Sequence, residues 1–212
     1  MRIEEEEFIK LIKNETIKTL VDVGANIGNY TSFVKSELPD IKTYCIEPIS
    51  SCFSKLENKF GSDEKVTLIN TIISSKNETV SFNEAVGKES HSSIVNRDWL
   101  YRKPEYKITK REIEATTLDN LIDENIDILK IDTEGYELAV LQGCEKLLKE
   151  NKIRYIQFEY GGCFKDNNIT LNDVIDYLKK YDYKVYSLTN GKLLEIKNYK
   201  DDYQWINFFA KK

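Results

Sequence analysis

The feature that most constrains this fold is a strand that leads directly into a glycine-containing turn and a helix start. The segment VDVGANIGNYT occupies residues 21–31 and continues an apolar run at 19–21. Such a run is typical of a strand that is covered on both faces. Gly24 and Gly28 permit positive φ angles and let a ligand approach the backbone closely. The following helix would direct unpaired N–H groups toward a carboxylate or phosphate, so the segment predicts a ligand-binding α/β unit.

A second strand ends in a carboxylate about twenty residues after the turn, which is the spacing of nucleoside-binding α/β units. Residues 46–48 read Ile-Glu-Pro, and Glu47 is the acid. An acid at this position accepts hydrogen bonds from two ribose hydroxyls. The alternative is a tight strand-to-helix turn with no ligand, and the addition of Asp22 and Glu47 to the glycines makes it less favoured. We therefore expect a nucleoside cofactor.

The spacing within the turn favours S-adenosylmethionine over a dinucleotide. A dinucleotide site has the pattern G-x-G-x-x-G, whose middle glycine admits a pyrophosphate. This turn has Ala25 and Asn26 between its glycines, and S-adenosylmethionine has no pyrophosphate to accommodate. We expect Asp22 to bind the ammonium of the methionine part and the turn amides to bind its carboxylate. A Walker phosphate-binding loop is excluded, because no Gly-Lys-Ser/Thr follows.

Three blocks of the sequence resemble the FkbM family of methyltransferases. They are VDVGANIGNYT at 21–31, IEP at 46–48, and TLDNLIDENIDILKIDTEGYELAVLQG at 117–143, whose K-I-D-x-E-G-x-E core is the family's hallmark. The segment QFEY at 157–160 is also similar to the family's next strand. The resemblance implies methyl transfer from S-adenosylmethionine to a hydroxyl oxygen, either on sugars of glycans or on polyketides and other natural products.

Strand and helix patterns alternate along the chain, as expected for a single α/β domain over residues 1–212. The expected strands are 19–23, 42–46, 66–70, 126–131, 153–158, 183–188 and 203–210. The expected helices are 3–17, 28–37, 51–60, 136–150 and 171–180, and the first of them lies within an N-terminal segment 1–18. We expect a Rossmann-like, class I methyltransferase sheet. It would have seven largely parallel strands in the order 3-2-1-4-5-7-6, with helices on both faces and the last strand antiparallel.

The pattern changes between residues 74 and 117. Segments with β character at 78–82 and 112–116 flank a polar stretch that contains Gly87 and His91. Long connections of this kind within a compact domain usually serve a function. We expect an insertion over the strand tips, built as a hairpin plus a mobile loop, that could cover a bound substrate.

Three carboxylates are expected at the carboxyl ends of the central strands, where open parallel sheets bind ligands. They are Asp132, Glu134 and Glu159. Methyl transfer is an in-line displacement, so an acceptor hydroxyl must be positioned and must lose its proton to a base. The three acids could supply this base and bind sugar hydroxyls. Alternatively, they could hold Mg²⁺, which would lower the pKa of the hydroxyl.

Two basic side chains are also candidates for catalysis. Lys130 lies two residues before Asp132 and should share its side of the strand. It could act in catalysis or pair with a buried carboxylate. His91 is the single histidine, and histidine ordinarily titrates near neutral pH, so it is a candidate base. An exposed loop histidine is the alternative.

Further cofactor contacts are expected around Glu47. Tyr30 should pack against the methionine part, whereas Thr71 and Ile72, which follow the third strand, should border the adenine. The complete expected cofactor set is Asp22, Gly24, Ala25, Asn26, Gly28, Tyr30, Glu47, Pro48, Thr71, Ile72 and Asp132.

Composition limits the partners. The net charge of −5 argues against nucleic acid, which requires a basic face. The sequence contains no apolar run long enough to cross a bilayer, and its acidic start is unlike a secretion signal. Four cysteines without paired spacing are typical of reduced thiols. We therefore expect a cytoplasmic enzyme with a small-molecule or glycan acceptor, and the N-terminal helix and the insertion could support a homodimer.

Other functions share part of this pattern. A natural-product O-methyltransferase would have the same motifs, and a non-catalytic protein would bind S-adenosylmethionine without turnover. A nucleic-acid methyltransferase is disfavoured, because the fourth strand ends in I-D-T-E-G at 131–135 and not in a proline-rich N/D-P-P-Y motif.

Overall fold

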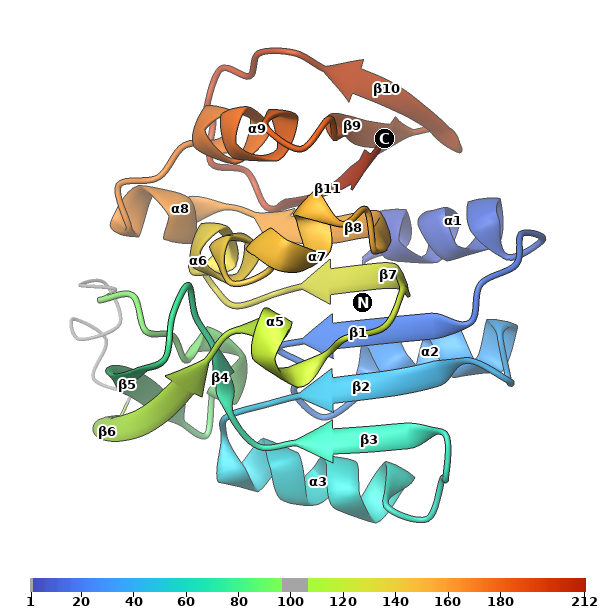
Figure 1. The fold of residues 1–212 in the computed structure, drawn as a ribbon. Coiled ribbons are helices and arrows are strands. Elements are labelled where there is room, and N and C mark those ends of the chain that lie inside the picture. The colour runs from blue at the N-terminus through green and yellow to red at the C-terminus, as the bar shows by residue number, and fades with distance from the viewer. Residues whose placement is uncertain (1, 97–106) are drawn as a thin grey trace.

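The computed structural model describes residues 2–96 and 107–212, whose strands form two sheets (Figure 1). The larger sheet has eight strands in the order β10-β9-β11-β8-β7-β1-β2-β3. Their bounds are β1 Thr19–Val23, β2 Lys42–Ile46, β3 Val66–Ile69, β7 Ile126–Ile131, β8 Ile153–Tyr160, β9 Lys184–Thr189, β10 Lys192–Ile196 and β11 Ile206–Lys211. Five neighbouring strands of this sheet pair in parallel, in the order β3, β2, β1, β7 and β8. The other three, β11, β9 and β10, pair antiparallel. The predicted Rossmann-like α/β class is confirmed.

The expected order of strands is also confirmed, but the sheet has an eighth strand, β10, at its edge. Asn190 and Gly191 have φ angles of 52° and 69° and form the turn of a β9–β10 hairpin, in which Thr189 pairs with Lys192. Asn-Gly between two strands is the strongest local signal for such a turn. The seven-strand prediction was wrong because all residues of β10 are at least partly exposed, which weakens its apolar pattern.

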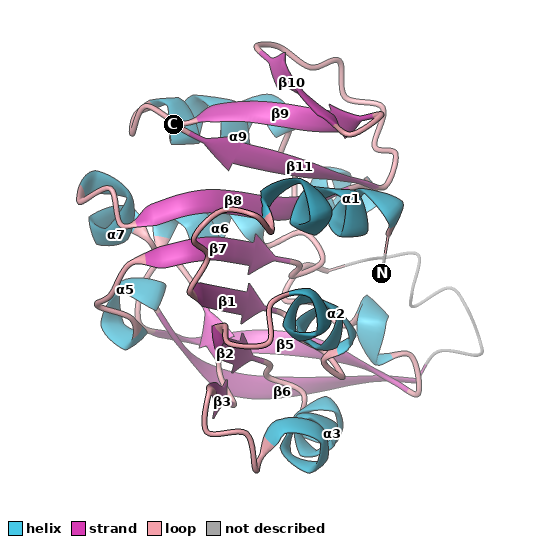
Figure 2. Cartoon of the chain, turned by 90° about the vertical axis from the view of Figure 1, so that its right-hand side faces the viewer, coloured by secondary structure: helices cyan, strands magenta, loops and turns pink. Residues whose placement is uncertain are grey.

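Helices cover both faces of the larger sheet (Figure 2). One face carries α1 (Ile3–Ile12), α2 (Asn29–Glu37) and α3 (Ser50–Phe60), and the other carries α5 (Leu118–Leu121), α6 (Glu137–Gln142), α7 (Glu145–Lys149), α8 (Gly162–Asp166) and α9 (Leu171–Lys179). Successive side chains of a strand point to opposite faces. Leu20 of β1 therefore packs with Phe8 of α1, whereas Val21 packs with Val140 of α6.

Two helix predictions need correction. The N-terminal helix ends at Ile12 and not at residue 17. The helix expected over 136–150 is divided into α6 and α7 at Gly143, where a Cβ atom would be 2.1 Å from the carbonyl oxygen of Ser74. Asp119 accepts hydrogen bonds from the backbone N–H groups of Lys146 and Leu147, at 2.8 and 3.0 Å. It thereby satisfies N–H groups at the start of α7.

The segment between 74 and 117 contributes most of the smaller sheet, which lies beside the carboxyl ends of β1, β2, β3 and β7 (Figure 1). Its order is β4-β6-β5, with β4 Ile72–Ile73, β5 Glu78–Val86 and β6 Lys107–Thr116, and the short helix η1 Glu89–His91 follows β5. The hairpin is longer than expected, because all of β5 pairs with residues 107–115 of β6. The predicted mobile loop includes residues 97–106, which lie outside the described residues.

Among the described helices, none combines the length and the apolar character that crossing a membrane would require. All four cysteines are free and buried, as expected for reduced thiols.

Candidate functional site

Two adjoining cavities open at the carboxyl ends of the central strands. The first has a volume of about 280 Å³ and lies between these strand ends and the smaller sheet. The second, of about 440 Å³, lies over the turn that follows β1. Both are lined by Glu5, Gly24, Asn26, Glu89, Ser90 and Asp132. The cavities are therefore two parts of one crevice, in the position where open α/β sheets bind ligands.

Most residues of the predicted site line this crevice. Those in the first cavity are Gly24, Asn26, Glu47, Pro48, Thr71, Ile72, Asp132, Glu134 and Glu159. Those in the second are Gly24, Ala25, Asn26, Tyr30, Lys130 and Asp132. The structure thus brings together residues that are far apart in the sequence, and Asp132 lies where the two cavities meet.

Glu47 fixes the turn after β1. The residue is 4% exposed, and its carboxylate accepts hydrogen bonds from the backbone N–H groups of Asn26 and Ile49, both at 2.8 Å. Burial raises the pKa of Glu47 to about 7, although these two hydrogen bonds oppose the shift. A carboxylate has about four acceptor positions, so Glu47 retains positions for ribose hydroxyls.

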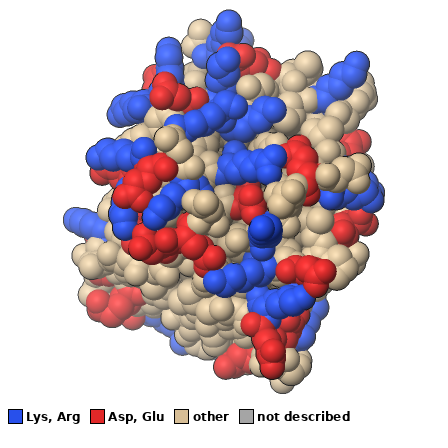
Figure 3. All heavy atoms as spheres, turned by 45° about the vertical axis from the view of Figure 1, so that its right-hand side comes forward, with Lys and Arg blue, Asp and Glu red and all other residues tan. Residues whose placement is uncertain are grey.

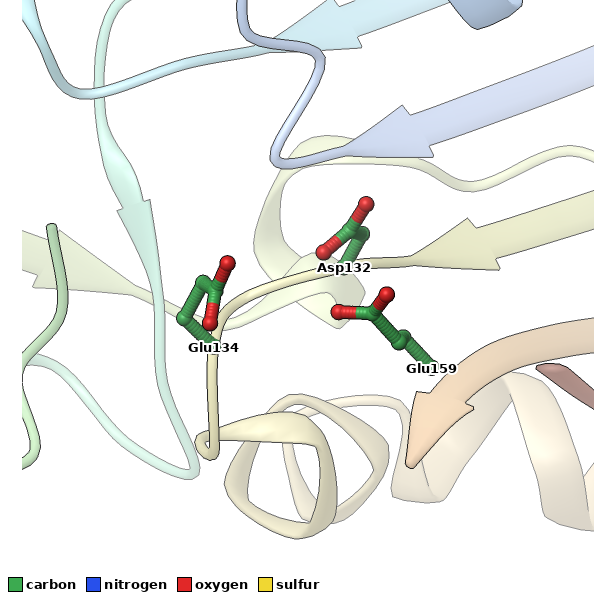
Figure 4. Close-up of side chains that lie close together, drawn as sticks. All are labelled: Asp132, Glu134 and Glu159. Atoms are coloured by element: carbon green, nitrogen blue, oxygen red, sulfur yellow. The ribbon is translucent and has the colours of Figure 1, made fainter. Parts of the chain in front are cut away.

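Asp132, Glu134 and Glu159 form an acid cluster, with carboxylate oxygens within 4.8 Å of one another (Figure 4). Asp132 and Glu134 lie in the loop after β7, and Glu159 lies in β8. The guanidinium of Arg2 binds Glu159 through Nη2 at 2.9 Å and Nε at 3.0 Å. Burial raises the pKa of Glu159, and the neighbouring Asp132 and Glu134 raise it further, which outweighs the opposing effect of Arg2. The cluster therefore favours retention of a proton or binding of a cation.

The loop that carries Glu134 is held from two sides. Glu137 is fully buried and accepts hydrogen bonds from the backbone N–H groups of Thr133 (2.8 Å) and Gly135 (3.0 Å). From the insertion, Ser93 Oγ donates to the carbonyl oxygen of Glu134 at 2.8 Å. Glu134 itself has a φ of 55°, a conformation that is uncommon for a non-glycine residue. These contacts position the acid cluster.

Lys130 is a buried cation between two acids. Its Nζ lies 3.2 Å from Oδ2 of Asp132 and 3.4 Å from Oδ1 of Asp22, and 5.2 Å from the centre of the Tyr30 ring. Burial alone would lower the pKa of Lys130, but Asp132 and Asp22 hold it well above its usual value. This geometry favours the ion-pair interpretation of Lys130 over a role in proton transfer.

Three predicted site residues line neither cavity. Asp22 is fully buried in β1 and accepts a hydrogen bond from Thr31 Oγ1 at 2.7 Å, so this geometry gives no support to the expected contact with the cofactor ammonium. Gly28 instead lets α2 pack against α3, because a Cβ atom there would be 2.5 Å from the Phe60 ring. His91 lies in η1 and does not line the crevice. Its two neighbours in the sequence, Ser90 and Ser92, line the first cavity. The structure therefore does not support His91 as the base.

The N-terminal segment supplies two wall residues that the sequence did not reveal, Arg2 directly before α1 and Glu5 within it. The glutamate run at 4–7 indicated only a helix start, but Glu5 lies three and four residues before Phe8 and Ile9, so helical spacing places it on the buried face of the helix. From the insertion, Phe82 and Ser92 also line the first cavity.

A sheet of this order with a glycine turn after β1 and an acid after β2 defines a Rossmann-like protein with a nucleoside-type crevice. The chain belongs to the FkbM methyltransferase family, because the profile of the Methyltransferase FkbM domain matches residues 22–185.

Two curated proteins are distant relatives. The chain is 24% identical to methyltransferase sdnD of Sordaria araneosa over 156 residues, which cover 60% of each protein. It is 23% identical to the 2-O-methyltransferase NoeI of Sinorhizobium fredii over 176 residues, which cover 77% of this chain and 72% of NoeI. The chain therefore spans less than two thirds of sdnD.

Solved structures share the fold. Methyltransferase FkbM from Methylobacillus flagellatus KT superposes with a TM-score of 0.61 at 16% identity, over 92% of this chain and 44% of that one. A Streptococcus mutans protein in complex with SAH superposes with a TM-score of 0.54 at 13% identity, over 100% of this chain and 98% of that one.

Proposed function

We propose that this chain is an S-adenosylmethionine-dependent O-methyltransferase that acts on a hydroxyl of a sugar or glycan. The observation that carries the proposal is the crevice, in which Glu47 and the acid cluster line the same cavity. Membership of the FkbM methyltransferase family supports methyl transfer, and the distant 2-O-methyltransferase relative supports oxygen as the acceptor atom.

In this proposal the cofactor spans both cavities. Glu47 accepts hydrogen bonds from the ribose hydroxyls, and the adenine lies beside Thr71 and Ile72 in the first cavity. The methionine part lies over Ala25 and Tyr30 in the second. Its carboxylate faces the start of α2, where the first N–H groups of a helix have no partner within the helix.

The reaction is a displacement at the methyl carbon. The acceptor oxygen forms a bond to the methyl group while the methyl–sulfur bond breaks, and the sulfonium becomes a neutral thioether. We assign the role of general base to Asp132, because it lies at the junction of the cavities. Glu134 and Glu159 accept hydrogen bonds from other acceptor hydroxyls and orient the acceptor.

A divalent cation is the alternative use of the acid cluster. Three carboxylates with oxygens within 4.8 Å of one another fit the ligand preference of Mg²⁺, which would lower the pKa of a bound hydroxyl. The bond between Arg2 and Glu159 favours the metal-free arrangement, since the guanidinium already supplies a positive charge there. Methyl transfer should therefore continue in the presence of a chelator. Loss of transfer that Mg²⁺ restores would assign the metal.

Trp205 offers support for a sugar acceptor. The residue is 39% exposed, and its indole packs against Gly161, directly after β8. The guanidinium carbon of Arg2, a residue of the cavity wall, lies 5.9 Å from the indole ring centre. Aromatic side chains are common at binding surfaces, and a partly exposed indole suits the C–H face of a sugar ring. We assign Trp205 to the rim of the acceptor site.

The surface charge on one face of the molecule gives no support to a nucleic-acid acceptor. On the face seen in Figure 3, basic and acidic side chains are interspersed and not separated by sign. A nucleic-acid footprint requires a continuous basic surface. The mixed charges of this face do not form one, and this agrees with the net charge of −5.

The test is incubation with methyl-labelled S-adenosylmethionine and a panel of sugars, glycans, polyketides and peptides. Label on a sugar hydroxyl is expected, and Asp132→Asn should reduce turnover by about 10²- to 10⁴-fold with a much smaller effect on cofactor affinity. Label on polyketides or peptides alone would contradict the sugar assignment. Cofactor binding without transfer to any acceptor would indicate a non-catalytic protein.

A further inference from the structure

Burial of Asp22 leaves the methionine ammonium of the proposed cofactor without its expected partner. Asp22 is inaccessible from either cavity and is already bound by Thr31 and Lys130. An ammonium group that leaves water requires a carboxylate or several acceptors. The other acids of the second cavity are therefore the first candidates for this role.

Of the described residues that line the second cavity, three carry carboxylates: Glu5, Glu89 and Asp132. Asp132 Oδ2 already pairs with the buried ammonium of Lys130, at 3.2 Å. Glu89 lies at the start of η1, beside exposed residues of the insertion, and accepts a hydrogen bond from the backbone N–H of Gly87 at 3.2 Å. Glu5 lines both cavities, as Glu89 and Asp132 do, but it is only 5% exposed and its carboxylate has no lysine partner among the ion pairs of the described residues. It is the acid best placed to bind a cation within the crevice.

We propose that Glu5, in the N-terminal helix, binds the α-ammonium of the cofactor's methionine part. This inference rests on the proposed cofactor. It makes α1 part of the cofactor site, whereas the sequence indicated only a helix that could support a homodimer.

The carboxylate of Glu5 is held in place before any ligand arrives. Oε2 accepts a hydrogen bond from the backbone N–H of Arg2 at 2.6 Å, and Oε1 accepts one from Gln157 Nε2 at 3.2 Å. Gln157 Oε1 in turn accepts a hydrogen bond from the hydroxyl of Tyr30 at 2.9 Å. This chain connects α1 to β8 and to the helix that follows the glycine turn. Each oxygen of Glu5 still has an acceptor position for an ammonium.

The surroundings also suit a cation. Burial raises the pKa of Glu5, and nearby Lys130 only partly opposes this effect. A carboxylate in such a position gains more from a bound ammonium than one in water does. Helix α1 is firmly docked, because Phe8, Ile9 and Ile12 are buried against the sheet.

The test compares two nucleosides by calorimetry. S-adenosylhomocysteine carries the amino-acid group, and 5′-methylthioadenosine lacks it. Glu5→Gln should weaken binding of S-adenosylhomocysteine by about 10- to 100-fold, the range for a lost hydrogen bond to a charged group. Binding of 5′-methylthioadenosine should not change. Glu6→Gln is the matched control, since Glu6 pairs with Lys10 at the surface and should leave both affinities unchanged.

Three results would overturn the inference. They are unchanged affinity of Glu5→Gln for S-adenosylhomocysteine, equal weakening of both nucleosides, and wild-type protein that binds neither. The last would also remove the proposed cofactor, whereas the first two leave the cofactor assignment intact. If Glu5→Gln does not fold, wild-type protein can be titrated with S-adenosylhomocysteine that lacks its α-amino group. This analogue should bind about 10- to 100-fold more weakly, and equal affinity would contradict the role of Glu5.

Discussion

The carbonyl oxygen of Asp132 lies so close to Gly24 that a Cβ atom on Gly24 would be only 1.9 Å from it. The backbone N–H of Asp132 also donates to the carbonyl oxygen of Val23, at 3.0 Å. The carboxyl ends of β1 and β7 are therefore adjacent. The glycine turn and the proposed catalytic base are held side by side by backbone contacts.

The first prediction concerns this contact. Gly24→Ala should destabilise the protein by more than about 3 kcal/mol, because the new methyl group would displace the backbone of Asp132. Gly87→Ala is the matched control: the φ angles are 81° at Gly24 and 78° at Gly87, but Gly87 has nothing within 4 Å of a Cβ. It should cost only the conformational penalty, about 1–2 kcal/mol. Urea unfolding measures both, and equal costs would contradict the steric explanation.

The second prediction concerns Lys130. Lys130→Met should destabilise the protein by about 3–5 kcal/mol, since it leaves the fully buried Asp22 without its positive partner. Combining it with Asp22→Asn should restore part of this loss. Urea unfolding of the two single variants and the double variant gives the coupling energy. Simple addition of the two single effects would show that the residues do not form a functional ion pair.

The third prediction concerns pH. The pKa of Glu47 rises from 4.5 to about 7 in the folded protein, mainly because the carboxyl group is buried. Its contribution to the free energy of unfolding should therefore fall as pH rises from about 4.5 to about 7. Cofactor binding requires the ionised form, so affinity for S-adenosylhomocysteine should increase about tenfold between about pH 6 and pH 8. Calorimetric titration across this range is the measurement.

Glu47→Gln controls for the other acids of the crevice. The glutamine of this variant cannot ionise. The affinity of the variant for S-adenosylhomocysteine should therefore be lower than that of the wild type, and it should not show the increase with pH that is attributed to Glu47. A pH dependence identical to that of the wild type would assign the titration to another group.

The fourth prediction concerns the acceptor rim. Trp205→Ala should raise the KM for a sugar acceptor by about tenfold, because a stacking surface is lost. Cofactor affinity should not change. Leu194→Ala, an exposed apolar residue of β10, is the control and should leave both constants unchanged. Steady-state kinetics with varied acceptor make the measurement, and an unaltered KM in Trp205→Ala would remove Trp205 from the rim.

The features that could be predicted from sequence are those determined by local chain geometry. The strand, the glycine turn and Glu47 follow one another within 30 residues, and a buried parallel strand has a clear apolar pattern. The same applies to β7 and the acids that follow it. Even β10 had a local signal in Asn190 and Gly191, which would have predicted the hairpin.

The remaining features depend on how distant segments meet. Glu5 and Gln157 are 152 residues apart, and their contact arises only when α1 docks on the sheet. Asp22 shows the same dependence, because its position in the motif suggested a ligand contact and the fold buries its side chain. In the strand its side chain points toward Thr31 of α2, beneath the turn and away from the crevice.

A crystal structure of the protein with bound S-adenosylhomocysteine tests the central claim most directly. The account predicts ribose hydroxyls on Glu47, the ammonium on Glu5, and the sulfur directed toward Asp132. A ligand bound outside this crevice, or a crevice that stays empty at concentrations that saturate the protein in solution, would contradict it.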